Sequence, residues 1–157
     1  MKFNHLEGYE SVTLPTETVN GKRYYVTPSG NKYPSVTTVT GMHNAKWVAK
    51  WRANVGAEKA DKISAQAAGR GSRYHYMQED FLNNLDITEK LKKATPLDQM
   101  MFNQTREITE KIGDIYMLEG SLYSDDLAIA GRVDCIAEFA GQVSVIDFKT
   151  STKAKSP

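Results

Sequence analysis

The sequence predicts an α+β fold in which an N-terminal β-hairpin and several helices precede a three-stranded antiparallel meander. Three observations support this order. A run of aromatic and β-branched residues near the N-terminus ends in a strong turn signal. The middle of the chain has apolar residues at helical spacing, and the last third alternates with period two between tight turns. Strands and helices segregated along the chain in this way are typical of the α+β class.

The N-terminal hairpin is predicted from two short strand signals. Lys22–Thr27 is rich in aromatic and β-branched residues, and the turn residues Pro28–Asn31 follow it directly. Val36–Thr40 is predicted to be the second strand, ended by Gly41. The two strands would pair as a hairpin.

The first helical segment contains both tryptophans of the chain. Trp47 and Trp51 are four residues apart and therefore share one helix face. Two interpretations follow: both rings pack into the core, which we favour, or they form a stacking platform for unpaired bases.

The second helical segment runs from Glu58 to about Asn83. Glycine in a helix interior costs about 1 kcal/mol relative to alanine, so Gly69 and Gly71 predict a break near Gly69. A second helix after that break would then carry His75 and Glu79 four residues apart.

A third helix is predicted to begin at Thr95, where a capping threonine and a first-turn proline stand together. It is expected to continue to about Leu118. Its apolar stripe would consist of Met101, Ile108, Ile112, Ile115 and Tyr116.

The last third is predicted to be an antiparallel meander. Its strands are Glu119–Ser124, Ile129–Phe139 and Gln142–Lys149, joined by turns at Asp125–Asp126 and Ala140–Gly141. Cys135 lies on the strand face opposite Asp134. It is expected to be a small buried apolar residue rather than a nucleophile.

Composition places the chain among ordinary globular proteins. With 157 residues and 40% hydrophobic content, a single domain spanning residues 1–157 is the default. No apolar run approaches the roughly 20 residues that span a bilayer, and the N-terminus lacks signal-peptide features, so we expect a cytoplasmic protein without a membrane partner. The single cysteine excludes an internal disulfide, a cysteine-rich zinc site and a four-cysteine iron–sulfur cluster.

Charge is unevenly distributed although the net charge is only +1. Lys46–Arg73 holds seven basic and two acidic residues, whereas residues 74–128 hold five basic and eleven acidic ones. The tail from Lys149 adds three lysines and no acid. The basic stretches are either solvated helix faces or the walls of a groove that follows a phosphate backbone.

The chemistry of the chain is concentrated in two neighbouring strand-like segments. Gly131–Asp134 ends in a carboxylate, and thirteen residues later Asp147 and Lys149 share one strand face, with Phe148 on the other. A divalent cation neutralises a phosphate and lowers the pKa of a bound water. Carboxylates suit Mg²⁺ or Mn²⁺, and a lysine can assist the nucleophilic water or the developing charge.

These motifs resemble the core of the PD-(D/E)XK nuclease superfamily. Gly131–Asp134 with Asp147–Ser151 is similar to its acid and Asp-x-Lys segments, although the proline of the family name is absent. Arg70–His75, followed by Glu79, resembles the histidine motif of the RecB-like exonuclease branch, and Tyr33–Val39 resembles a segment that precedes it. The nearest subgroup contains the mitochondrial genome maintenance exonuclease and related phage exonucleases. The likeness extends from about Tyr24 to Lys155.

The resemblance implies a restriction-endonuclease-like core and a set of site residues. Asp134 and Asp147 would be direct ligands of Mg²⁺ or Mn²⁺, with the Phe148 carbonyl as a backbone ligand and His75 as an additional ligand. Lys149 would be the catalytic lysine. The competing interpretation of Asp147 and Lys149 is an exposed ion pair, and that of Asp134 is a surface ion pair with Arg132 or Lys149.

The remaining assignments from the resemblance are less direct. Glu119 matches an acid near the metal, or is a boundary charge. Glu79 would orient the His75 imidazole, or is a surface carboxylate. The implied phosphate contacts are Arg70, Arg73 and Lys153, and Trp47 and Trp51 are the candidate base-stacking residues.

Members of the superfamily continue past the lysine strand into a helix with a Gln-x-x-x-Tyr motif. This chain stops at Pro157, so we expect that helix to be missing and a partner chain or segment to complete the domain. The predicted function is a Mg²⁺- or Mn²⁺-dependent DNA exonuclease acting on single-stranded or frayed ends, in recombination or repair. The alternatives are a structure-specific endonuclease and an inactive DNA-binding or scaffolding module. Without an Arg-rich transit segment, a phage-infected or bacterial cell is favoured over a mitochondrion.

Overall fold

The computed structural model describes residues 2–9 and 12–151. Over these residues the chain forms two three-stranded antiparallel sheets and four helices, which confirms the α+β prediction. The N-terminal sheet contains β1 (Thr16–Val19), β2 (Lys22–Val26) and β3 (Lys32–Pro34). The helices are α1 (Val36–Val55), α2 (Ala57–Leu82), α3 (Thr88–Lys93) and α4 (Pro96–Thr109). The second sheet contains β4 (Ile112–Ser124), β5 (Ile129–Phe139) and β6 (Gln142–Ile146).

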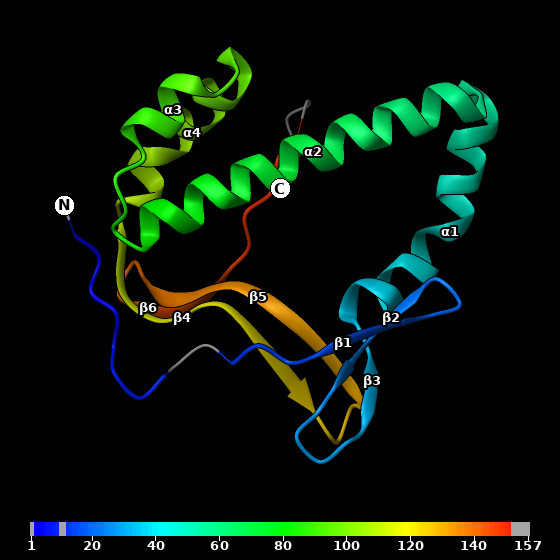
Figure 1. Cartoon of the computed structure of the whole chain (residues 1–157), viewed down its shortest axis with the longest axis horizontal. Helices are drawn as coiled ribbons and strands as arrows, with labels where there is room; N and C mark the ends of the chain where they lie inside the picture. The colour runs from blue at the N-terminus through cyan, green and yellow to red at the C-terminus, as the bar shows by residue number, and fades with distance from the viewer. Residues whose placement is uncertain (1, 10–11, 152–157) are drawn as a thin grey trace.

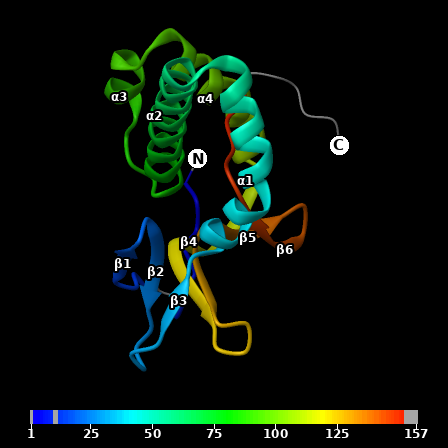
Figure 2. The ribbon, with the colours of Figure 1, turned by 90° about the vertical axis from the view of Figure 1, so that its right-hand side faces the viewer.

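Helix α2 lies across one face of the β4–β6 sheet, and α1 rises from the N-terminal sheet to meet its start (Figures 1 and 2). Helices α3 and α4 pack at the other end of α2. After β6, the chain leaves the sheet and runs up towards α2. A Cβ built on Gly71 of α2 would lie 4.0 Å from Thr150 Oγ1, so the two segments are in contact.

The main core lies between the end of α2 and the β4–β6 sheet. Its buried members are Phe3, Leu82, Ile112, Ile115, Cys135 and Ala137. The complete burial of Cys135 confirms its predicted role as a small packed residue. Among the described helices, none combines the length and apolar character that a membrane span requires.

The prediction of a strand at Val36–Thr40 is wrong, because α1 begins at Val36. Ser35 caps this helix: its side chain accepts a hydrogen bond from the backbone N–H of Thr38. The hairpin partner of β2 is instead β3, with Tyr25 opposite Tyr33. A bridge from Ser35 to Ala130 then brings the start of α1 against β5.

The predicted helix break near Gly69 is also wrong, since α2 is continuous over 26 residues. Two glycines lower helix propensity, but tertiary packing routinely overrides a penalty of this size. Gly71 is where the chain after β6 passes the helix, but a Cβ there would make only an ordinary van der Waals contact, so the spacing does not require glycine.

The third predicted helix was extended too far. The Thr95 cap is confirmed, but α4 ends at Thr109, and the apolar residues after it belong to β4. Ile112 pairs with Phe139 and Ile115 with Ala137, so these isoleucines are buried as strand residues. A short apolar run fits either period, and long-range strand pairing decided between them.

In the meander, β5 has the predicted bounds Ile129–Phe139. Strand β4 is longer than predicted at its start, and β6 ends at Ile146 instead of Lys149. Asp147 and Lys149 therefore lie just beyond the sheet. The prediction of a missing C-terminal helix concerns chain outside the described residues.

Candidate metal centre

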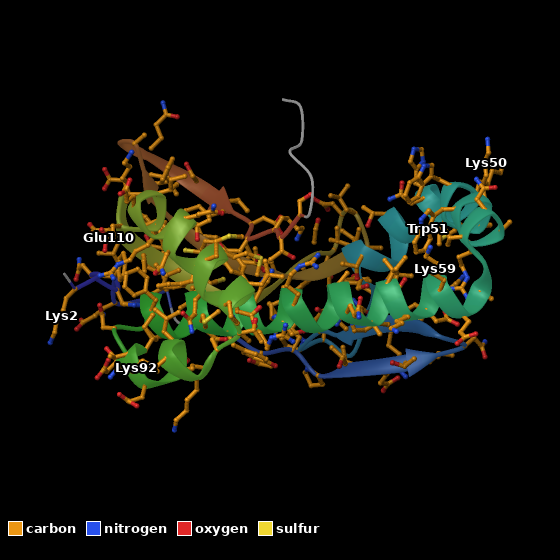
Figure 3. All side chains as sticks on the ribbon, turned by 90° about the horizontal axis from the view of Figure 1, so that it is seen from above. Lys2, Lys50, Trp51, Lys59, Lys92 and Glu110 are labelled. Carbon is orange, nitrogen blue, oxygen red and sulfur yellow. The ribbon has the colours of Figure 1, made fainter. Side chains whose placement is uncertain are left out.

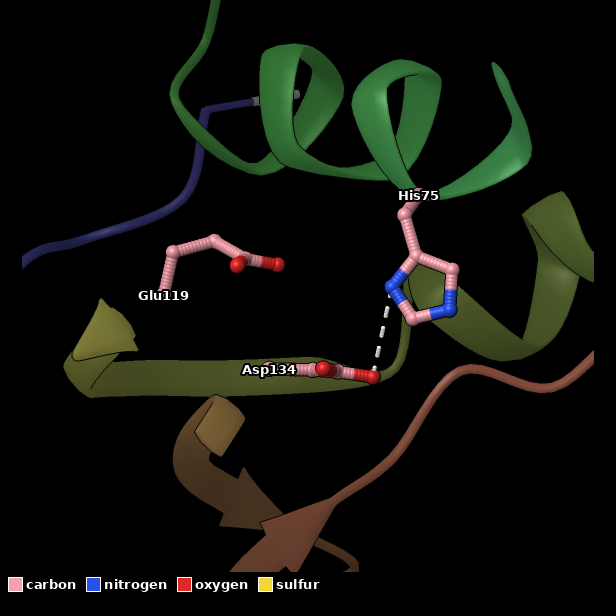
Figure 4. A group of neighbouring side chains, drawn as sticks. All are labelled: His75, Glu119 and Asp134. Atoms are coloured by element: carbon pink, nitrogen blue, oxygen red, sulfur yellow. Dashed lines mark ion pairs between the residues drawn. The ribbon is translucent and has the colours of Figure 1, made fainter. Parts of the chain in front are cut away.

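Three side chains from three different elements meet above the β4–β6 sheet, and we refer to them as the acid–histidine group. They are His75 from α2, Glu119 from β4 and Asp134 from β5 (Figure 4). Their ligand atoms all lie within 4.8 Å of one another, and His75 Nδ1 is 3.5 Å from Asp134 Oδ2. The Glu119 and Asp134 side chains are only 15% and 14% exposed.

Strand register explains why the two carboxylates meet. Leu118 pairs with Cys135 and Gly120 with Val133, so Glu119 falls opposite Asp134. Residues directly opposite in an antiparallel pair share a face, and like charges there are unfavourable. Glu119 also has a φ of 51°, which is uncommon for a residue with a long side chain. Strain and charge repulsion at one position favour a functional role for it.

Electrostatics at Glu119 point the same way. Burial raises the pKa of this carboxyl, Arg132 opposes the shift, and the charges of Asp134 and Glu79 raise it further. The ionised form of Glu119 is therefore disfavoured by its surroundings. A bound cation would reverse this imbalance, because it adds positive charge between the carboxylates.

Asp134 is held in place from the segment after β6. The backbone N–H of Phe148 donates a 2.8 Å hydrogen bond to Asp134 Oδ2. The Phe148 ring lies edge-on to the His75 ring, with centroids 6.3 Å apart, and packs against the main core. Phe148 thus supports two members of the acid–histidine group. The role of its carbonyl as a metal ligand stays a prediction.

Asp147 and Lys149 lie next to the group but outside it. Because Cys135 pairs with Ile146, continuing the register by one residue places Asp147 opposite Asp134. The ladder stops at Ile146, however, and the Asp147 side chain is 56% exposed and bound to Lys149 Nζ at 2.5 Å. The structure therefore brings together His75, Asp134 and Glu119, and it leaves Asp147 paired with the lysine.

A groove of about 750 Å³ connects this centre to the N-terminal sheet, and we call it the β5 groove. Its wall includes the helix start at Thr37 and the length of β5 from Ile129 to Asp134. Its polar and charged lining residues include Arg23, Thr37, Arg132, Asp134, Asp147 and Lys149. A Cβ at Gly131 would lie 3.1 Å from Val36 Cγ2, so this glycine allows α1 to approach β5 closely.

The two predicted phosphate contacts on α2 are engaged differently. Arg73 holds Asp98 of α4 through Nε–Oδ2 and Nη2–Oδ1 contacts of 2.7 and 3.3 Å. Arg73 is therefore committed to packing α2 on α4. Arg70 has a buried Nε for which the described residues provide no hydrogen-bond partner. Its phosphate role stays a prediction, and Lys153 lies outside the described residues.

Glu79 lies one helical turn after His75 on α2 and contributes to the field at Glu119. It therefore faces the acid–histidine group. Its predicted role in orienting the imidazole stays a prediction, since the two have no hydrogen bond among those that the structure shows for the described residues.

Core packing of both tryptophans is wrong, because α1 has no buried residue and Trp47 is 68% exposed. The rings of Trp47 and Trp51 are parallel to within 2°, with centroids 6.5 Å apart. Lys50 and Lys59 lie at the same end of the molecule (Figure 3). Base stacking by this pair stays a prediction.

Sequence reasoning considered Arg132 only as a possible ion-pair partner of Asp134 and gave it no role in the site. Its Nε lies 2.9 Å from Glu119 Oε2, so it pairs with Glu119 and not with the adjacent carboxylate. The signal that could have indicated this pairing was the register of the predicted hairpin between Glu119–Ser124 and Ile129–Phe139.

The acid–histidine group fits a small divalent cation. Carboxylate oxygens with one imidazole are a donor set for Mn²⁺ and, with water, for Mg²⁺. Ligands at about 2.1 Å from one ion lie at most about 4.2 Å apart. That upper bound applies only to opposite ligands, and adjacent ligands lie about 3.0 Å apart, so separations of up to 4.8 Å must close by up to about 1–2 Å for all three side chains to bind one ion.

Comparison with known proteins gives a consistent result at low identity. No family model matches the chain. It is 29% identical over 130 residues to the mitochondrial genome maintenance exonuclease 1 of Xenopus tropicalis, and 26% identical over 133 residues to that of Homo sapiens. The alignments cover 78% and 80% of this chain but 37% and 38% of the relatives. The chain thus spans less than two fifths of the length of these curated relatives, and the similarity supports a relationship to a nuclease family.

Proposed function

We propose that this chain carries the metal centre of a DNA exonuclease that hydrolyses phosphodiester bonds with Mg²⁺ or Mn²⁺. The observation that carries the proposal is the convergence of His75, Glu119 and Asp134 from three elements beside the β5 groove, which His75 and Asp134 line. The similarity to proteins named as exonucleases supports the same activity. The position of His75 on α2 supports the RecB-like branch.

In this mechanism the acid–histidine group would hold the cation, and Asp147 would join it if its side chain turned away from Lys149. When bound, the cation neutralises the phosphate and lowers the pKa of a water. Lys149, released from Asp147, would position the attacking water, accept its proton when the amine is neutral, or stabilise the developing negative charge. The Phe148 N–H keeps Asp134 Oδ2 oriented throughout.

The β5 groove supplies the path for the substrate. Arg23 and Arg132 give its wall positive charge, which suits a phosphate backbone. The exposed Trp47 ring and the half-buried Trp51 ring beside it are a surface on which unpaired bases can stack. On this basis we propose a preference for single strands or frayed ends.

The test is degradation of end-labelled single-stranded and duplex DNA with Mg²⁺, with Mn²⁺ and with EDTA. Asp134→Asn retains an oxygen that accepts from the Phe148 N–H but removes the charge, so it should abolish metal-dependent cleavage. Lys149→Ala should lower kcat by about 100-fold or more. Undiminished cleavage in EDTA or in both variants would contradict the mechanism.

Lys32→Ala is the matched control for Lys149→Ala. Lys32 forms an ion pair of 2.7 Å with Glu17, and both lysine pairs are exposed to a similar extent. It lies on the N-terminal sheet, outside the residues that line the β5 groove. Its removal should leave cleavage unchanged.

One observation favours a second function, a DNA-binding module without activity of its own. Asp147 is paired with Lys149 and not gathered with the other ligands. DNA binding that survives Asp147→Ala, with no cleavage in either metal, would support this second function. Linearisation of circular single strands would instead indicate an endonuclease.

A further inference from the structure

We infer that Arg132 is a positioning residue, which fixes the Glu119 carboxylate so that its second oxygen faces the cation held by His75 and Asp134. This inference deepens the proposed function and rests on its metal centre. It assigns a specific task to an arginine to which the proposed function gives only a general positive charge in the groove wall.

The first support is geometric. Arg132 and Glu119 lie on neighbouring strands, and the Nε of Arg132 is 2.9 Å from Oε2 of Glu119. The contact is made to Oε2 of the carboxylate, and the inference assigns the cation to the other oxygen. In Figure 4 the Glu119 side chain extends towards His75, which is the direction that a shared cation requires.

The second support is the conformation of Glu119. A glutamate side chain has several rotatable bonds, and its freedom must be lost when it becomes a ligand. Glu119 is further constrained by its φ of 51°. A carboxylate already fixed by a guanidinium has lost that freedom before the cation arrives. Partners that orient a ligand in this way commonly change metal affinity by about 10-fold or more.

The third support is the disposition of Arg132 itself. Its side chain is 62% exposed and lines the β5 groove. An arginine has five N–H donors, and the contact through Nε uses one of them. The guanidinium can therefore orient Glu119 and present its other N–H groups to the groove, where a phosphate would pass. A lysine could supply the positive charge, but its compact ammonium group lacks the planar fork of donors that can contact Glu119 and a phosphate at the same time.

The experiment is a calorimetric titration of the metal-free protein with Mn²⁺, without DNA, in a double-mutant cycle. Arg132→Ala should weaken Mn²⁺ binding by about 10-fold, and Arg132→Lys should restore part of the loss. In a Glu119→Ala background, the further change Arg132→Ala should not weaken Mn²⁺ binding any more, because no carboxylate remains to be positioned. Thermal melts of each variant establish that it is folded.

Arg23→Ala is the matched control. Arg23 lines the same groove, but its side-chain hydrogen bond goes to Thr37 and not to the acid–histidine group. Its removal should leave Mn²⁺ affinity unchanged, so a loss confined to the Arg132 variants is not a general effect of lowering the groove charge.

Three outcomes would overturn the inference. Unchanged or tighter Mn²⁺ binding in Arg132→Ala would mean that the guanidinium only repels the cation. Equal weakening with and without Glu119 would mean a merely structural role. Absence of Mn²⁺ binding in the wild type would overturn the metal centre as well. If wild-type protein binds Mn²⁺ and cleaves DNA while the cycle shows no coupling, only the inference about Arg132 fails.

Discussion

Replacing Arg73 by alanine should destabilise the fold without weakening DNA binding. The resemblance implied a phosphate contact for Arg73, but the structure shows both ends of its guanidinium on Asp98. Asp98 has no exposed surface, and its pair with Arg73 joins α2 to α4. Arg73 lies two residues before His75, so the pair also helps to hold the helix that supplies the imidazole.

The size of the effect follows from the burial of the two partners. Removing one partner of a buried pair costs about 3–5 kcal/mol, because the other charge is left uncompensated. The Arg73 side chain is 54% exposed, so in the variant water reaches Asp98 and replaces part of the interaction. We therefore expect a loss of about 2 kcal/mol in the free energy of unfolding, near that of a hydrogen bond to a charged group.

Arg106→Ala is a matched control within the same helical layer. Arg106 is 53% exposed, as Arg73 is, but its partner Glu110 is 33% exposed and lies four residues away on the surface. An exposed pair of this kind contributes about 0.5 kcal/mol, and the Arg106 contact with the Phe81 ring adds a similar amount. The two variants therefore differ mainly in the burial of the carboxylate.

Urea denaturation followed by circular dichroism measures the two losses, and fluorescence anisotropy with labelled single-stranded DNA measures binding. At a loss of about 2 kcal/mol, Arg73→Ala should melt about 4–8 °C below the wild type. Equal losses for Arg73→Ala and Arg106→Ala would refute the argument from burial. Weaker DNA binding by fully folded Arg73→Ala would show that this arginine contacts the phosphate backbone after all.

Three further predictions concern pH, packing and thiol reactivity. The arginine partner lowers the pKa of Asp98 from its usual 3.8, so the stability that ionised Asp98 contributes is present above that value and is lost as pH falls below it. The difference in unfolding free energy between the wild type and Asp98→Asn should therefore shrink between about pH 5 and about pH 3, and a constant difference would contradict this. Gly120→Ala should destabilise the fold by about 1–3 kcal/mol, because the added Cβ would lie 2.3 Å from Met117 Sδ. Gly41→Ala in the exposed α1 should instead stabilise the fold by about 0.5–1 kcal/mol. Urea titrations that give both changes the same sign would contradict the packing argument. Burial, with the nearby carboxylates adding to it, raises the pKa of Cys135 to about 12, so a thiol reagent at neutral pH should label it only after unfolding, and rapid labelling of native protein would be inconsistent with this burial.

Local sequence signals determined the parts of the molecule that depend on residues close together in the chain. The Thr95 cap, the strand Ile129–Phe139 and the segregation of helices from the meander follow from capping, alternation and turn residues. The candidate residues His75, Glu119 and Asp134 could also be named from motif and spacing. The predicted ligand set was Asp134, Asp147 and His75, with Glu119 only as an acid near the metal, whereas the structure groups Glu119 with His75 and Asp134.

Only the tertiary structure decided which of those residues come together. Apolar spacing between Ile112 and Leu118 fits a helix as well as a strand, and pairing with β5 over long range selected the strand. That choice set the register that puts Glu119 opposite Asp134 and within reach of Arg132. Pairing between two segments also set the end of β6 at Ile146. Asp147 lies beyond that end and forms an ion pair with Lys149. Strand register is a property of two segments at once, so neither segment alone contains it.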